Sequence, residues 1–528
     1  MARSFDRRTL LRTGAMSLAA VAGAPILAAC SNDDTGPAAG AVSGTPTPRS
    51  GGTLRAAFVG GGAAETLNFL MGPTGLDYVR ARCTHGALGV LDPAAEHGVR
   101  YGVLERIDVS EDLRTYTVKV RPGVTFTDGS TLTARDLLYS LNAPVALGSL
   151  PFLKPPSQNF DLAAATVTDD ATLVLPTLRP IADGRLVLCQ STLVFKDGTT
   201  EFTPDMPTCG PFKLVEFEPG QGAVFTRHDD YYGLALGGGP YLDGLELRTV
   251  PDATARVNAL TGGQVDFVSD IGPVAARTVE GDGRFAVAVS DLPYATSLSF
   301  GLNLSFAPFA DVRVRQAVKY AIDREAIVRN VFFDRAFVGN DLASLGFSDY
   351  ADEIEQRPYD PDRAKALLTE AGVGTIEVAV TTAPEVAGMA ETATVVVENL
   401  KAVGIEATLD QRPTGQLFSD FAAYVQLPFA ASYGPAVPPL SSYAATRTAG
   451  SPSTFGFNRP DIDDLVAQAR SAVDPDLRRD AAVRAQRLIW EEGNQVIPVF
   501  APSINGHTTA VYGVRDEPFS SFEQAYLA

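Results

Sequence analysis

The segment from Ser297 to Val328 constrains the fold more than any other part of this 528-residue chain. Its first half alternates strictly between apolar side chains and small or polar ones. The apolar positions are Leu298, Phe300, Leu302 and Leu304. A period of two is typical of a β-strand with one buried face. Pro308 follows this strand and is expected to end it.

A helix is predicted to follow, with Asp311 as its N-cap. Its apolar residues fall at helical spacing and form one buried stripe: Val314, Ala317, Val318, Ala321 and Ile322. The residues between them are expected to face outwards: Arg313, Arg315, Gln316 and Lys319. We therefore interpret the whole segment as a crossover between two lobes, with Asn303 on a strand face that looks into the space between them.

Length and charge limit the number of domains and the kinds of partner that the chain can have. A chain of 528 residues is too long for one core and should divide into two or three domains. Its apolar content of 45% suits packed cores. A net charge of −19 repels phosphate backbones, so no nucleic-acid partner is expected.

The first 29 residues have the features of a signal peptide. Adjacent Arg7 and Arg8 in a basic start resemble a twin-arginine export signal, and the sequence 27–30 resembles a lipobox that ends at Cys30. Cleavage there would leave Cys30 as a lipidated terminus; the alternative is a transmembrane anchor. Residues 30–52 have almost nothing to bury and are expected to be a disordered tether.

Two stretches of the body have clear local patterns. Residues 115–120 alternate as a strand, and Thr133 with Asp136 forms a capping-box variant that opens a helix, so this part is a small α+β unit. Farther on, residues 376–381, 385–402 and 405–410 have the patterns of a strand, a helix and a strand. This order predicts a right-handed βαβ unit.

Catalytic signatures are missing from the sequence. There is no G-x-S-x-G, P-loop, H-E-x-x-H or C-x-x-C pattern. The four histidines are widely spaced, so we expect no metal site and no cofactor. The chain is therefore expected not to be an enzyme.

Three cysteines remain after Cys30. In an oxidising compartment, Cys189 and Cys209 are the best candidates for a disulfide, and Cys83 would stay buried and free. The spacing alone does not fix the pairing.

Several segments together resemble the family 5 extracellular solute-binding proteins of ABC importers, which include dipeptide and oligopeptide receptors. The resemblance spans most of residues 50–510. The matching segments are 110–117, 123–134, 210–214, 311–324 and 359–368. It implies an α/β, bilobal periplasmic-binding-protein-like fold (type II, the class with an extra domain), with three domains that close around ligand by hinge motion.

In the domain organisation expected from this resemblance, lobe I is made of three separate segments of the chain. Lobe I combines residues 53–75, 190–292 and 500–528. Residues 76–189 form an additional α+β domain II, and residues 293–499 form lobe II, or domain III. The chain would cross between the lobes near 290–305 and again near 495–503.

The resemblance also directs attention to ligand-binding residues. The candidates are Leu67, Asn68, Asn303, Tyr424, Ser432, Tyr433 and Gly434. For the aromatic residues the alternative is core packing, and Asn303 could instead be a hydrogen-bonding residue of the hinge. Peptide-binding relatives hold the ligand's α-amino group with an aspartate in the 421–443 region, but this chain has no carboxylate between Asp420 and Asp461. Either the ligand is blocked, neutral or non-peptidic, or an acid from elsewhere substitutes.

The function expected from these features is solute capture outside the cytoplasm. A monomeric receptor, anchored to the membrane through lipid at Cys30, would deliver a peptide or peptide-like solute to an ABC permease with a separate ATPase. An opine, a sugar or a metal chelate is the alternative ligand. Other classes left open are a secreted hydrolase and a sensor lipoprotein without a transport role.

Overall fold

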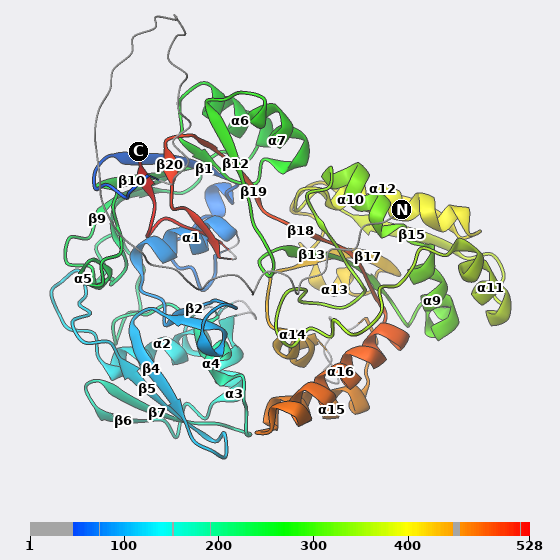
Figure 1. The fold of residues 1–528 in the computed structure, drawn as a ribbon, viewed down its shortest axis with the longest axis horizontal. Coiled ribbons are helices and arrows are strands. Elements are labelled where there is room, and N and C mark those ends of the chain that lie inside the picture. The colour runs from blue at the N-terminus through cyan, green and yellow to red at the C-terminus, as the bar shows by residue number, and fades with distance from the viewer. Residues whose placement is uncertain (1–45, 73, 150–152, 191, 447–454, 518) are drawn as a thin grey trace, which may run out of the picture. The chain divides into compact units, whose positions relative to one another are not determined.

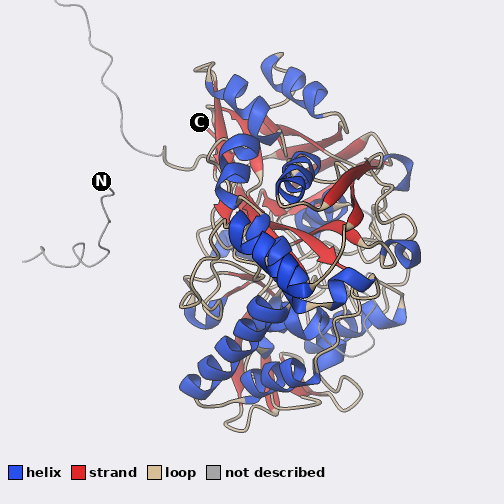
Figure 2. Ribbon diagram, turned by 90° about the vertical axis from the view of Figure 1, so that its right-hand side faces the viewer, coloured by secondary structure: helices blue, strands red, loops and turns tan. Residues whose placement is uncertain are grey.

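The computed structural model describes residues 46–528, apart from residues 73, 150–152, 191, 447–454 and 518. The predicted signal peptide, the lipidation site Cys30 and most of the predicted tether lie outside the described residues. The described chain is an α/β protein with three large sheets covered by helices (Figures 1 and 2). Within it, no helix has both the length and the apolar character needed to cross a bilayer.

Lobe I is built on a seven-stranded sheet. Its order is β12 (Phe285–Val289), β19 (Ile504–Thr508), β11 (Phe267–Val268), β1 (Thr53–Phe58), β10 (Gly244–Thr249), β9 (Gly222–Arg227) and β8 (Phe212–Glu218). The central strand β1 runs parallel to β10 and β11, and the other pairings are antiparallel. Its helices are α1 (Gly75–Thr84), α5 (Tyr232–Ala235), α6 (Ala253–Thr261) and α7 (Gly272–Glu280). The expected boundaries assign α1 to the additional domain, but Leu76 and Val79 of α1 pack in the core of the lobe I sheet.

The additional domain has a four-stranded antiparallel sheet. Its order is β4 (Leu104–Val109), β5 (Thr115–Val120), β7 (Thr172–Pro176) and β6 (Thr166–Asp169). Alternate residues of β5 are buried, as the sequence predicts. Thr133 forms the expected capping box with Asp136 at the start of α2 (Ala134–Ala146). Two short helices, α3 (Pro155–Asn159) and α4 (Gly184–Cys189), complete this unit.

Lobe II is built on a six-stranded sheet. Its order is β14 (Phe337–Val338), β18 (Gln495–Ala501), β13 (Thr296–Leu302), β17 (Phe429–Gly434), β15 (Glu377–Thr382) and β16 (Glu406–Gln411). β13 is the predicted strand, but it ends at Leu302 instead of near Pro308. Every residue from Leu298 to Leu302 is buried, since β13 is a central strand covered on both faces, so the prediction of one exposed face is wrong.

Nine described helices belong to lobe II. They are α8 (Ala307–Ala310), α9 (Val312–Ala321), α10 (Arg324–Phe332), α11 (Pro361–Ala371), α12 (Met389–Ala402), α13 (Phe421–Tyr424), α14 (Pro439–Thr446), α15 (Pro460–Ser471) and α16 (Pro475–Glu492). Asp311 caps α9 by accepting a hydrogen bond from the Arg313 backbone N–H at 2.8 Å, as predicted. The parallel pair β15 and β16, joined through α12, is the predicted βαβ unit.

The remaining strands form small two-stranded ladders. They are β2 (Gly89–Leu91) with β3 (Val99–Tyr101), β20 (Val511–Tyr512) with β23 (Tyr526–Leu527), and β21 (Arg515–Glu517) with β22 (Phe519–Ser521).

The chain passes between the seven-stranded and the six-stranded sheet twice. It leaves β12 in lobe I for β13 in lobe II, and it returns from β18 to β19. The two passages are bonded to each other, because the Ser290 N–H donates to the Ser503 carbonyl at 3.0 Å and the Ser503 N–H donates to the Ser290 hydroxyl at 2.8 Å. Two neighbouring connections of this kind permit rotation of one lobe against the other.

The predicted disulfide is wrong. Cys83, Cys189 and Cys209 are all free and buried. The sulfur of Cys209 packs against Gly86, and that of Cys189 packs against Gly89. Burial raises the pKa of each of the three thiols to about 12, which keeps them protonated.

Candidate functional site

An unpaired strand edge lies at the end of β17 in lobe II. β13 pairs with β17 along its whole length, from Phe429 to Gly434. On the other side, β15 pairs only with Phe429 and Ala430, because β15 ends at Thr382. Among the described strands, residues 432–434 therefore have a partner on one side only. Such an edge can accept an extended chain by main-chain hydrogen bonding.

Three predicted ligand-binding residues occupy this edge. Ser432 and Gly434 are half-buried, whereas Tyr433 is 41% exposed. The Ser297 hydroxyl of β13 donates to the Gly434 carbonyl at 3.3 Å, which fixes the strand end. Burial, reinforced by the nearby Glu385 carboxylate, raises the pKa of Tyr433. The hydroxyl therefore stays a hydrogen-bond donor at neutral pH.

Tyr424 packs in the core below this edge. Its side chain is 3% exposed, and its hydroxyl donates to the Ala431 carbonyl at 3.1 Å. The ring contacts Phe418 and Phe455 edge-on. Burial raises the pKa of Tyr424 to about 12. The alternative role of core packing therefore describes Tyr424 better than ligand contact.

Asn303 is fully engaged with the protein. It is 3% exposed, and its Nδ2 donates to the carbonyls of Val425 at 3.1 Å and Leu427 at 3.2 Å. Its Oδ1 accepts the Ser305 backbone N–H at 3.0 Å. These bonds use the donors and the acceptor of the amide, so Asn303 positions the segment before β17 instead of facing a ligand.

Leu67 and Asn68 belong to lobe I, in the turn after β1. The Asn68 Oδ1 accepts the Leu70 N–H at 3.2 Å, and the Thr66 hydroxyl accepts the Asn68 N–H at 3.1 Å. Both side chains are half-buried. Asp77 also fixes this turn, because its Oδ1 accepts the Thr66 N–H at 3.1 Å. The structure thus fixes the backbone of this turn, and it places the turn on a different lobe from the β17 edge.

Glu385 is a candidate site residue that the sequence did not single out. It follows β15, and its carboxylate accepts the backbone N–H groups of Gly415 at 3.0 Å and Leu417 at 3.3 Å. Its charge contributes to the raised pKa of Tyr433, so it lies close to the exposed edge of β17. The charge of a carboxylate outside the 421–460 segment therefore acts on this edge, and both of its oxygens also accept the Gly415 N–H at 3.0 Å. No local pattern marks it, since its proximity depends on the packing of β15 against β17.

A second feature missed by the sequence joins the additional domain to lobe II. The Arg470 guanidinium donates from Nε to both Asp183 carboxylate oxygens at 3.1 and 3.0 Å, and from a terminal nitrogen to Oδ1 at 3.1 Å. The Ala182 N–H also donates to the Arg470 carbonyl at 2.6 Å. The two charged residues lie 287 positions apart in sequence, so no spacing rule could pair them.

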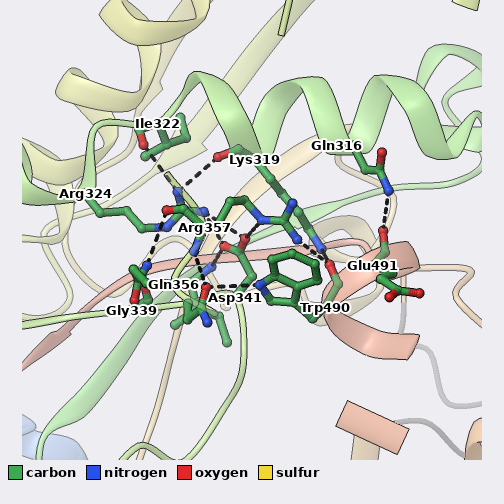
Figure 3. Close-up of polar contacts among 12 residues, drawn as sticks. Gln316, Lys319, Ile322, Arg324, Gly339, Asp341, Gln356, Arg357, Trp490 and Glu491 are labelled. Atoms are coloured by element: carbon green, nitrogen blue, oxygen red, sulfur yellow. Dashed lines mark hydrogen bonds and ion pairs between the residues drawn. The ribbon is translucent and has the colours of Figure 1, made fainter. Parts of the chain in front are cut away.

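A buried charge network lies inside lobe II (Figure 3). Asp341 accepts two 2.8 Å bonds from Arg324 and one 3.0 Å bond from Arg357. The Arg357 guanidinium also stacks on the Trp490 ring, 3.9 Å from its centre. Burial alone would raise the pKa of Asp341, but the charges of Arg324, Lys319 and Arg357 outweigh it and hold this pKa below its ordinary value.

This network corrects the prediction that Arg315 and Lys319 face outwards. Lys319 is fully buried and Arg315 is 5% exposed. The Lys319 Nζ donates to the Trp490 carbonyl at 3.2 Å, and Arg315 donates to the Glu492 carbonyl at 3.1 and 2.7 Å. Both side chains donate to the C-terminal end of α16, where carbonyl groups lack helical partners.

Metal-binding chemistry does not appear at these sites. Within the described part of the chain, no group of three or more His, Cys, Asp or Glu side chains is placed to hold an ion.

Residues 98–451 match the family described as bacterial extracellular solute-binding proteins, family 5 Middle. Among curated relatives, the chain is 26% identical over 298 residues to the dipeptide-binding protein of Escherichia coli (strain K12), covering 52% of this chain and 55% of that protein. It is 25% identical over 445 residues to the glutathione-binding protein GsiB of Shigella flexneri, covering 80% and 85%. The chain thus spans only about half of the first relative.

Solved structures share the fold. AgaA of A. tumefaciens R10, in complex with agropinic acid, is 21% identical with a TM-score of 0.76, covering 90% of this chain and 99% of that one. The oligopeptide-binding protein AppA of Bacillus subtilis, in complex with a nonapeptide, is 20% identical with a TM-score of 0.75, covering 91% and 100%. The bilobal fold with an additional domain is therefore that of a periplasmic binding protein. The chain belongs to the family of bacterial extracellular solute-binding proteins, family 5.

Proposed function

We propose that this protein captures a peptide or peptide-like solute outside the cytoplasm and delivers it to an ABC permease. Anchoring through lipid at Cys30 and a monomeric state belong to the same proposal. The observation that carries the ligand class is the open edge of β17, where residues 432–434 have a strand partner on one side only. Main-chain pairing at such an edge gives affinity for an extended chain without reading its side chains.

The charge at the edge suits a ligand with a free amine. Glu385 lies beside Tyr433 and would supply the carboxylate that the 421–460 segment lacks. A charge-assisted hydrogen bond to a partly buried carboxylate contributes about 1.5–3 kcal/mol. We therefore propose Tyr433, Ser432 and Gly434 as ligand contacts, with Glu385 as partner of the amine and Leu67 and Asn68 as contacts from lobe I.

A non-peptidic ligand is the second candidate. The absence of a carboxylate between Asp420 and Asp461 favours it, because a ligand without an amine would need none. Relatives with different ligands, such as the agropinic acid complex of AgaA, have the same fold. The two candidates differ in whether binding requires a positive charge.

Native mass spectrometry of gently purified protein tests the role in capture, because a bound solute adds its own mass. Calorimetry with trialanine and N-acetyl-trialanine then tests the ligand class. We expect the free peptide to bind at least about tenfold more tightly, and Glu385→Gln to remove the difference. Tyr359→Phe, which changes an exposed tyrosine outside the site, is the matched control. Equal binding of both peptides would exclude the role of Glu385, and binding of neither would favour the non-peptidic candidate.

A further inference from the structure

Helix α7 of lobe I lies beside α10 of lobe II (Figure 1). It follows β11, which runs parallel to β1. In lobe II, the loop of residues 383–388 follows β15, which runs parallel to β17. The start of α7 and this loop therefore both lie at the carboxyl ends of parallel strands, which is where open α/β sheets bind ligands. Contacts made by α7 are thus at the binding edge of each lobe.

The C-terminal half of α7 contacts the residues that end α10. The Arg277 guanidinium lies over the Phe333 ring, 5.2 Å from its centre. The Arg335 guanidinium donates to the Glu280 carboxylate at 2.6 Å. Water reaches both contacts, because Phe333 is 36% exposed and the side chains of Glu280 and Arg335 are 40% and 23% exposed. Exposed ion pairs and cation–π contacts are individually weak, so these can break without unfolding either lobe.

The start of α7 meets the loop that contains Glu385. A β-carbon built on Gly272 would lie 3.6 Å from the β-carbon of Ala387, which is ordinary van der Waals contact. Two positions before Ala387, the Glu385 carboxylate accepts the Gly415 N–H, and its charge acts on Tyr433 at the β17 edge. One short loop therefore joins α7 to the candidate site.

The lobe II side of this contact should move as one body. A β-carbon on Gly388 would lie only 2.4 Å from the Phe332 ring, so the 383–388 loop and the end of α10 are packed on each other. The two passages between the lobes, bonded at Ser290 and Ser503, permit a rotation that would carry both loops away from α7 together.

We propose that these contacts form a reversible clasp between the lobes. The α7 clasp consists of three residues from each lobe: Gly272, Arg277 and Glu280 of α7, and Phe333, Arg335 and Ala387 of lobe II. When it is formed, it holds the lobes closed; when it breaks, lobe II turns about the two passages. A ligand that touches both lobes binds only the closed fraction, so the clasp would raise its affinity without contacting it. This holds for any ligand class.

The test is a disulfide trap on the full protein without ligand, in which Cys30→Ser removes the remaining cysteine that is not buried in the body. Gly272→Cys with Ala387→Cys suits the trap, because disulfide-bonded β-carbons are about 3.5–4.5 Å apart. Oxidised glutathione accepts the two electrons and two protons that the thiols lose. We expect an internal disulfide in most molecules, and mass spectrometry distinguishes it from glutathione adducts.

The matched control for the trap is Gly272→Cys with Ala402→Cys. Ala402 is exposed at the far end of α12, about 20 Å along that helix, so this pair should form no internal disulfide.

Further variants show which contacts close the clasp and whether it opens. Phe333→Leu with Arg335→Gln, added to the trap, should lower the rate of cross-linking about fivefold. Arg329→Gln, which breaks an exposed pair on α10, should leave that rate unchanged. Ala387→Trp puts a bulky side chain against α7, so it should enlarge the radius of gyration in small-angle scattering without lowering the free energy of unfolding. Ala402→Trp is its control.

Three outcomes would overturn the proposal: no internal disulfide in the folded trap variant, an unchanged rate after loss of Phe333 and Arg335, or the same radius of gyration for Ala387→Trp and the wild type. Gly272 has a φ of +73°, which strains a cysteine. If the trap variant does not fold, the scattering of Ala387→Trp decides alone. These measurements contain no ligand, so this proposal and that of solute capture can fail separately.

Discussion

Two aspartate–arginine pairs in this protein have similar geometry and different neighbours. Asp341 with Arg324 and Asp183 with Arg470 are both bonded through two carboxylate oxygens, at 2.8 Å and at 3.0–3.1 Å respectively. The first pair lies wholly inside lobe II, with side chains 0% and 2% exposed. The second joins the additional domain to lobe II, with 6% and 13% exposed.

Because of this difference in location, one pair should contribute to the free energy of unfolding and the other to the arrangement of the domains. Breaking a pair inside one lobe leaves buried charges that only unfolding can hydrate. Breaking a pair between two domains leaves charges that reach water when the domains separate, while each domain stays folded. The same chemistry is therefore expected to affect the free energy of unfolding in one place and the domain arrangement in the other.

Asp341→Asn gives the largest expected effect. It leaves Lys319, Arg324 and Arg357 buried without their carboxylate, so the free energy of unfolding should fall by about 3–5 kcal/mol. Urea denaturation measures this loss. Glu325→Gln, which breaks an exposed pair with Arg329, should cost less than about 0.5 kcal/mol. A loss below about 1 kcal/mol for Asp341→Asn would show that the network does not stabilise lobe II.

Asp183→Asn should change the arrangement of domains more than their stability. We expect a shift of about 1–2 kcal/mol towards separation of the additional domain from lobe II. Small-angle scattering should detect it as a larger radius of gyration than that of the ligand-free wild type. Ser441→Ala, which removes a weak 3.4 Å bond to the same carboxylate, is the control and should have little effect. An unchanged radius of gyration, together with a large loss of unfolding free energy in urea, would show that the two pairs have the same role.

Asp349→Asn tests the same junction through pH. Burial, aided by the charge of Asp183, raises the pKa of Asp349 above 3.8, although Arg478 and Arg479 oppose this. A raised pKa in the folded state means that the protonated form favours folding, so this contribution is present below pH 3.8 and is lost as pH rises through the folded pKa. At pH 7 the variant should be more stable by up to about 1 kcal/mol. Thermal unfolding at pH 3.5 and 7 checks this, and an equal offset at both pH values would exclude ionisation as the cause.

The smallest effect is expected at Glu280. Its carboxylate, on α7 of lobe I, lies 2.6 Å from Arg335 of lobe II, and the side chains are 40% and 23% exposed. Glu280→Gln should change the free energy of unfolding by at most about 0.5 kcal/mol. The change should disappear in 1 M salt, where the Debye length is about 3 Å. Persistence of the effect at high salt would show that the pair is less accessible to solvent than its exposure indicates.

Local rules predicted much of the framework. Asp311 and Thr133 cap helices as expected, because capping depends on residues only two or three positions apart. Val314, Ala317 and Val318 are buried on the predicted face of α9. Lys319 and Arg315 were mispredicted because their partners are carbonyls of α16, more than 170 residues away.

The candidate site was less predictable for the same reason. Tyr424 and Tyr433 have equally aromatic surroundings in the sequence, yet one is 3% and the other 41% exposed. Tyr424 lies at the end of α13 and packs against Phe418 and Phe455, whereas Tyr433 lies at the end of β17, beyond the last residue paired with β15. The Asn303 Nδ2 donates to carbonyls more than 120 positions away, so its role in holding that segment could not be predicted from its neighbours in the sequence.

Cys83, Cys189 and Cys209 are buried, so they should not react with maleimides while the protein is folded. Once Cys30, the fourth cysteine of the sequence, has been replaced, cysteines introduced at exposed positions of the additional domain and of lobe II can therefore receive fluorescent dyes. Energy transfer between such dyes would follow individual molecules as they open and close. The native thiols would react only on unfolding, and would thus report denaturation in the same sample.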